Sequence, residues 1–184
     1  MSTVCPPILS PVCFTTDIQV QTFARAINHV AVSVHDIEAV TAWYTEIMGF
    51  RVIGDRIFHI KRSESPSAAI FAIYGEALHE VKLAYMTTGN GVGFKVFQFI
   101  DPDFKANAVN FEYNRGGFFH ICVTDPSPDA LADRIVQNGG SRQGTTVKVA
   151  GGAAICVYVK DPWGNVVEIL DTSFDRMATM DVAQ

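Results

Sequence analysis

A twofold internal repeat constrains this chain of 184 residues more than any other feature. Each copy begins with a strand-like stretch of alternating apolar residues that carries a histidine, His29 in the first copy and His120 in the second. An amphipathic helical stretch follows each strand and closes on a glycine 20 positions after the histidine, at Gly49 and at Gly140. The equal spacing indicates that the two histidines hold equivalent places in two copies of one unit.

Three further strands are predicted after each helix. They lie at residues 50–54, 81–86 and 91–97 in the first copy, and at residues 141–147, 153–159 and 164–170 in the second. Each copy is therefore a βαβββ module, and the fold class is α+β. The alignment of residues 91–97 with 164–170 places Lys95 opposite Glu168 in the repeat.

The modules are expected at residues 26–112 and 113–174, and together they form one domain. Residues 1–25 are expected to be an N-terminal arm around the domain or a partner, and residues 175–184 a C-terminal tail. Residues 58–74 interrupt the first module with a polar piece and a short helix at 67–74. This insertion either covers a site or is a surface excursion.

Composition excludes several classes of function. The net charge is -5 and no basic stripe is present, which argues against a nucleic-acid partner. No apolar run approaches the roughly 20 residues of a membrane span, and the N-terminus does not have the pattern of a signal peptide. The four cysteines lack metal-finger spacing and are expected to be reduced thiols of a cytoplasmic protein. The expected partner is a small-molecule substrate, and a homodimer remains open.

Strand alternation separates two faces in each module. His29 lies on the face opposite three valines in the first strand, and His120 lies opposite Ile121 and Val123 in the second module. The aliphatic faces should pack under the helices. The mixed faces, which carry small and polar residues and both histidines, should line a concavity, with Phe97, Phe99 and Phe118 either as aromatic walls or as ordinary core.

Glu168 stands between Val167 and Ile169 in an otherwise apolar strand. A glutamate in such a place is rarely buried without a partner, and a metal ion would supply one. Two histidines and one glutamate from separate strands suit a single divalent ion of zinc, iron(II), manganese, nickel or cobalt. The sequence therefore predicts a metal site made by His29, His120 and Glu168.

The chain resembles the vicinal-oxygen-chelate superfamily, which includes glyoxalase I, methylmalonyl-CoA epimerase, fosfomycin-resistance proteins and extradiol dioxygenases. The motifs that carry the resemblance are Ile27–Val34, Trp43-Tyr44, Met48-Gly49-Phe50 and Asp161–Glu168, and with the repeat they cover residues 26–172. The resemblance implies that the modules form a cupped, barrel-like eight-stranded sheet with helices outside and one metal within.

The family takes its metal ligands from the first and last strands of each module. The corresponding positions here are His29, Lys95, His120 and Glu168. Lys95 departs from the pattern, because a protonated lysine has no lone pair for a metal. The ion then has three protein ligands, or the register slips and Gln98 or Glu80 serves as the fourth.

Three functions follow from the resemblance. The first is a lyase, isomerase or epimerase that holds an enolate or oxyanion on the metal, with Glu168 or a neutral Lys95 as the base and Tyr158 as a hydrogen-bond donor to the substrate. The second is an iron(II) extradiol-type dioxygenase, whose tail pattern residues 157–168 satisfy, although the histidine that this pattern wants near residues 149–151 is missing. The third is a non-catalytic binding protein. A largely apolar cup favours a small, oxygenated, hydrophobic molecule, and no cofactor motif besides the metal set is present.

Overall fold

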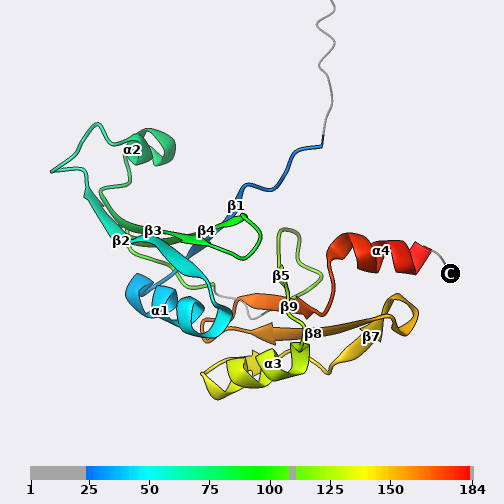
Figure 1. The fold of residues 1–184 in the computed structure, drawn as a ribbon. Coiled ribbons are helices and arrows are strands. Elements are labelled where there is room, and N and C mark those ends of the chain that lie inside the picture. The colour runs from blue at the N-terminus through cyan, green and yellow to red at the C-terminus, as the bar shows by residue number, and fades with distance from the viewer. Residues whose placement is uncertain (1–23, 108–110, 183–184) are drawn as a thin grey trace, which may run out of the picture.

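The computed structural model describes residues 24–107 and 111–182, which form two modules in tandem (Figure 1). The first module contains β1 (His29–Ser33), α1 (Ile37–Met48), β2 (Arg51–Lys61), α2 (Ala69–Tyr74), β3 (Glu80–Thr87) and β4 (Gly93–Asp101). The second contains β5 (Ile121–Thr124), α3 (Pro128–Gln137), β6 (Ser141–Arg142), β7 (Val147–Val149), the 3-10 turn η1 (Ala150–Gly152), β8 (Ala154–Lys160) and β9 (Val166–Leu170). Helix α4 (Phe174–Val182) follows.

The described strands form two sheets with the same topology. The first sheet has the order β1-β4-β3-β2, and the second has the order β5-β9-β8-β6 with β7 paired to β8. In both, the first strand of the module runs parallel to the last, and the other pairs are antiparallel. The α+β fold of two βαβββ modules is confirmed. Within the described residues the strands make a four-stranded and a five-stranded sheet that do not close into a barrel.

The registers of the two sheets are equivalent at their centres. Ala31 of β1 faces Lys95 of β4, and Cys122 of β5 faces Glu168 of β9. Ala31 and Cys122 each lie two residues after the repeat histidine. The structure therefore gives Lys95 the place in the first module that Glu168 has in the second, as the repeat predicts.

Helices α1 and α3 cover the aliphatic faces of the two sheets. The core under α1 includes Phe94 and Val96, and the core under α3 includes Val167 and Ile169. Trp43 packs against both cores, as do a few other partly buried residues. Helix α1 begins at Asp36, whose carboxylate accepts a hydrogen bond from the Ala39 amide, and it ends at Gly49 with a φ of 71°.

Several hydrogen bonds join the modules on this side, among them one from the Arg134 guanidinium of α3 to the Glu46 carbonyl of α1 at 2.8 Å. The Tyr44 hydroxyl donates to Asp161 Oδ2 at 2.8 Å in a buried setting, and the Trp43 indole donates to the Asn138 carbonyl at 2.9 Å. Because both helices lie on the same side of the two sheets, the opposite faces of the sheets also turn to one side of the molecule (Figure 1). We call these the open faces, and they carry Lys95 and Glu168.

The insertion in the first module covers part of its open face. Helix α2 contributes Ile70 and Phe71 to a third core cluster, where they pack with Leu83 and Phe97 of the sheet. Because Phe97 and Lys95 lie two positions apart on one strand, α2 is on the same face as Lys95. The short helix expected at 67–74 is present, and it covers this face instead of standing away from the domain.

Several element bounds differ from the sequence-based prediction. Strand β2 extends to Lys61, beyond the predicted end at residue 54, because its pairing with β3 resumes after a register shift between Val52 and Ile57. The predicted strand at 141–147 is instead two short strands, β6 and β7, with Gly144 at a φ of 84° between them. The expected C-terminal tail forms helix α4. No helix in the described part of the chain is long and apolar enough to cross a membrane.

Candidate metal centre

Glu168 lies at the centre of the second open face, in strand β9. Its neighbours in sequence, Val167 and Ile169, are buried in the core under α3, so strand alternation turns the Glu168 side chain to the opposite face. Its partners in the adjacent strands are Cys122 of β5 and Tyr158 of β8. The carboxylate is thus surrounded by side chains from the strands on both sides.

His120 is the nearest candidate ligand to Glu168. Its Nε2 lies 3.2 Å from Glu168 Oε2, and the two side chains are 25% and 15% exposed. The imidazole meets the Tyr158 ring edge-on at 5.4 Å. The other ring nitrogen, Nδ1, is buried and has no hydrogen-bond partner among the described residues. A buried polar atom without a partner is costly, and functional sites are where such atoms are tolerated.

Two thiols and a phenol complete the surroundings of the carboxylate. Cys156 Sγ donates to Glu168 Oε1 at 3.1 Å. Burial, and then the charge of Glu168, raise the pKa of the Cys122 thiol to about 12. Burial also raises the pKa of Cys156 to about 12 and that of Tyr158 well above its usual range, again with Glu168 contributing. All three groups therefore stay protonated at neutral pH, and Cys156 donates a hydrogen bond to the carboxylate.

His29 lies on the other sheet. It is exposed at the start of β1, and its Nδ1 contacts Asn28 Oδ1 at 2.7 Å, which leaves Nε2 as the nitrogen for a ligand. Within residues 24–107 and 111–182 of one chain, no three His, Cys, Asp or Glu side chains lie close enough to hold one metal ion. The structure thus brings His120 and Glu168 together but does not bring His29 to them, and their sharing of one ion stays a prediction.

Lys95 stands on the open face of the first sheet. Its ammonium lies 5.3 Å from the Tyr85 ring centre and 5.9 Å from the Phe97 ring centre. The alternatives for a fourth ligand have other partners. Gln98 Oε1 accepts a hydrogen bond from the Ile37 amide at the start of α1, and Glu80 pairs with His59 at 2.6 Å. The register therefore favours Lys95 at the fourth position.

The residues around Glu168 fit a divalent ion. Two donor atoms bonded to one ion at 2.0–2.2 Å with tetrahedral or octahedral angles lie about 3.0–3.5 Å apart, and the 3.2 Å between His120 Nε2 and Glu168 Oε2 falls in this range. Imidazole and carboxylate are both donors that zinc, iron and manganese accept. One chain, however, supplies only two of the three predicted ligands at this place.

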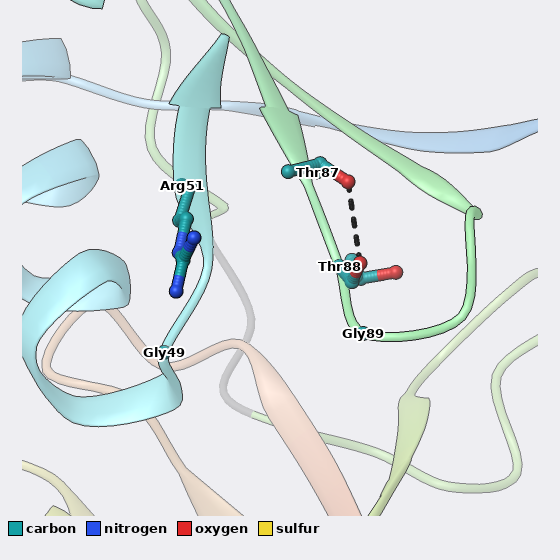
Figure 2. Close-up of a pocket in the computed structure, with 5 residues that line it drawn as sticks. All are labelled: Gly49, Arg51, Thr87, Thr88 and Gly89. Carbon is teal, nitrogen blue, oxygen red and sulfur yellow. Dashed lines mark hydrogen bonds between the residues drawn. The ribbon is translucent and has the colours of Figure 1, made fainter.

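Two depressions of the structure lie away from this centre. One, of about 250 Å³, is lined by Gly49, Arg51, Thr87, Thr88 and Gly89 at the end of β3 (Figure 2). Another, of about 330 Å³, lies beside the start of α1 and includes His35, Gln98 and Phe104. Neither is lined by His29, Lys95, His120 or Glu168, and the second contains only Gln98, the alternative candidate for the fourth ligand. Lys95 and Glu168 lie on the open faces of the two sheets.

The repeat in the sequence identifies four residues of the candidate site, which are His29, Lys95, His120 and Glu168. It does not identify the role of the two thiols. Alternation already places Cys122 and Cys156 on the mixed face. The contact of the two cysteines with Glu168 depends on the pairing of β9 with β5 and β8, and local sequence patterns do not predict this pairing. Of the three predicted aromatic walls, Phe97 and Phe99 lie on the open face, whereas Phe118 is fully exposed in the loop before β5.

The paired modules and the histidine–carboxylate centre define a protein of the vicinal-oxygen-chelate class. Residues 26–169 match the family model of the Glyoxalase/Bleomycin resistance protein/Dioxygenase superfamily, and the chain belongs to this family. The resemblance drawn from the sequence motifs is thereby confirmed. The family includes lyases and dioxygenases and acts on small molecules.

Individual relatives are distant. The lactoylglutathione lyase of Salmonella typhimurium is 22% identical over 151 residues, which cover 78% of this chain and 90% of that protein. A glyoxalase family protein from Bacillus cereus superposes with a TM-score of 0.68 at 15% identity, covering 83% of this chain and 97% of that one. The fosfomycin resistance protein FosX from Listeria monocytogenes, solved with Mn(II) and sulfate, superposes with a TM-score of 0.54 at 14% identity and the same coverage. At these identities the solved structures show the fold alone.

Proposed function

We propose that this protein is a metal-dependent lyase, isomerase or epimerase that works in the cytoplasm on a small, oxygenated, hydrophobic substrate. The observation that carries the proposal is the His120–Glu168 pair, with its 3.2 Å separation and the unpartnered Nδ1 of His120. A lyase among the sequence relatives and a manganese-bound structural neighbour support it. The bound ion would be zinc, iron(II), manganese, nickel or cobalt.

We propose further that a second copy of the chain completes each site. The two open faces turn to the same side of one molecule, so the faces that carry His29 and Glu168 do not face each other (Figure 1). A second copy placed against this side by a twofold axis would set the first module of one chain against the second module of the other. His29 of one chain would then join His120 and Glu168 of the other.

Exposed apolar side chains support such a contact. Tyr85 and Phe119 are 37% and 43% exposed, and Phe118 is fully exposed. Tyr85 belongs to the first open face, and Phe119 packs against His120 at 4.6 Å between ring centres. Apolar side chains of this size gathered around a candidate site are typical of a surface that a partner or a ligand covers.

The ion, when bound, would polarise adjacent substrate oxygens and stabilise the charge of an enolate or oxyanion. Tyr158 keeps its proton at neutral pH and can donate it in a hydrogen bond to a substrate oxygen. Cys156 holds one oxygen of Glu168, so the other oxygen, which faces His120, is the one available for the ion. Glu168 would move the proton, because it is the carboxylate at the centre of the second open face.

The set of two histidines and one carboxylate also favours a second candidate function. This set with open positions is the arrangement of non-haem iron(II) dioxygenases, and the strand–turn–strand from Val157 to Glu168 has their tail pattern. Oxygen uptake by protein loaded anaerobically with iron(II) would distinguish a dioxygenase from a lyase. Stoichiometric ligand binding without turnover would identify a binding protein.

The test of the shared site is a mixing experiment with His29→Ala and Glu168→Gln. Each variant alone should bind little metal. In a mixed dimer one site carries both changes and the other carries neither, so random exchange of subunits should restore about a quarter of the wild-type metal. His29→Ala mixed with His29→Ala/Glu168→Gln is the matched control and should restore none. No recovery in the first mixture, once subunit exchange has been verified, would contradict a site shared between chains.

A further inference from the structure

Lys95 is a half-buried cation that has no carboxylate partner within residues 24–107 and 111–182. No ion pair joins it to an acidic side chain within the described residues, whereas Lys61, Lys82, Arg62 and Arg142 all have such partners. The rings of Tyr85 and Phe97 lie within 6 Å of its ammonium. A ring face attracts a cation but carries no net charge, so no described residue pairs an opposite charge with Lys95.

The rings around Lys95 form a continuous apolar platform. Phe58 meets Tyr85 edge-on at 5.8 Å, Phe97 stacks on Phe99 at 5.7 Å, and Tyr74 of α2 meets Phe99 at 5.6 Å. Tyr85 and Tyr74 are 37% and 49% exposed, so the platform is accessible at both ends. The α2 insertion is therefore the element that widens the apolar surface beside Lys95.

A second cation lies at the far side of this platform. The Arg56 guanidinium is 4.5 Å from the centre of the Phe58 ring, and it too has no acidic partner within the described part of the chain. Two cations thus bracket the pair of rings Phe58 and Tyr85. This arrangement presents positive charge beside flat apolar surface, and no acidic side chain of the described residues pairs with either cation.

We infer that the substrate is an apolar, aromatic-sized molecule with a carboxylate, which pairs with Lys95 while the body of the molecule lies on the platform. This inference rests on the proposed function, in which the reacting oxygens of the substrate bind the ion. It adds the chemical class of the substrate. A glutamate at position 95, as in the repeat partner Glu168, would balance the charge of a divalent ion. A lysine there leaves two positive charges in excess, and the substrate is the remaining source of negative charge.

A single ammonium favours a carboxylate over a phosphate. Phosphate sites in proteins gather several donors, such as arginine forks or a run of backbone amides. Lys95 offers one point charge with three donors, and Arg56 is separated from it by two rings. A monoanionic carboxylate matches the single charge of Lys95, and the reacting oxygens of the substrate would offset the charge that remains on the ion.

The test measures binding of 2-naphthylacetate and its neutral analogue 2-naphthylacetamide by calorimetry, with both zinc-loaded and chelator-stripped protein. The wild type should prefer the acid. Lys95→Gln should weaken binding of the acid by about tenfold or more and leave the amide unchanged. Lys95→Arg should retain the preference for the acid. Arg56→Gln should reduce this preference by about two- to threefold, because this cation is at the exposed rim. Lys148→Gln changes an exposed lysine of the second module and should leave the preference intact.

Equal affinity of wild type for acid and amide, or a preference that persists in Lys95→Gln, would overturn the inference, and so would no detectable binding of the acid. Measurements on the chelator-stripped protein distinguish a failure of this inference from a failure of the proposed function. If the protein binds no metal but the Lys95-dependent preference persists, the metal centre fails and the carboxylate site stands. If metal binds at His120 and Glu168 but the preference is absent, the metal centre stands and the carboxylate site fails.

Discussion

Lys95 and Glu168 occupy the same register position in the two modules of this protein, because each pairs with the residue that lies two places after the repeat histidine in the first strand of its module. One position carries a cation and the other a carboxylate. The two modules therefore differ in charge at a position where their strand registers are equivalent. The metal and substrate proposals both follow from this difference.

Lys95→Glu should tighten metal binding. The change would restore a carboxylate at the fourth ligand position and remove a cation that repels the ion. We expect the dissociation constant for zinc to fall by about tenfold or more, as an added carboxylate–metal contact implies. Competition with a chromophoric chelator measures this constant, and Lys148→Glu controls for a general change of charge. Unchanged zinc affinity in Lys95→Glu would show that this side chain does not reach the centre.

Cys122 should react slowly with alkylating reagents although it is exposed. Only the thiolate is nucleophilic, and burial together with Glu168 raises the pKa of this thiol to about 12. The thiolate fraction therefore stays small at pH 8 and grows about tenfold with each pH unit up to pH 12. Mass spectrometry of chelator-stripped protein treated with iodoacetamide should show Cys122 modified at least about a hundredfold more slowly than in urea.

Glu168→Gln should speed this modification, because it removes the negative charge that disfavours the thiolate. The rate should remain below that of the unfolded chain, since burial is the larger cause of the raised pKa. Native Cys122 that reacts as fast as unfolded Cys122 at pH 8 would mean that the thiol does not lie against the carboxylate as described.

Tyr44→Phe should lower the free energy of unfolding by about 1.5–3 kcal/mol, the usual contribution of a buried hydrogen bond to a charged group. The Tyr44 hydroxyl donates to Asp161 across the two modules, and both residues are at most 3% exposed. Urea denaturation gives the measurement. Tyr113→Phe, at a tyrosine that is 76% exposed, is the control and should change the stability little. Equal effects of the two substitutions would argue against a stabilising link between the modules.

The sequence predicts much of this fold because its signals are local. Alternation along the first strand and the 20-residue spacing place His29 and His120, and the apolar neighbours of Glu168 turn it to the same face. Strand β2 shows where local signals end, because its extension past Gly54 depends on pairing with β3. The position of His29 away from His120 is a property of how two sheets pack, which no residue pattern encodes.

The central claim is that His29, His120 and Glu168 bind one divalent ion. Elemental analysis of protein purified without a metal-affinity tag tests it most directly, with His120→Ala and Glu168→Gln beside the wild type. His59→Ala is the matched control, because His59 pairs with Glu80 outside the site. We predict close to one zinc, iron, manganese, nickel or cobalt ion per chain in the wild type and in His59→Ala, and a loss of about tenfold or more in the two site variants, each of which removes one ligand. Wild-type protein that takes up no ion when one is supplied, or the same content in His120→Ala, would contradict the claim.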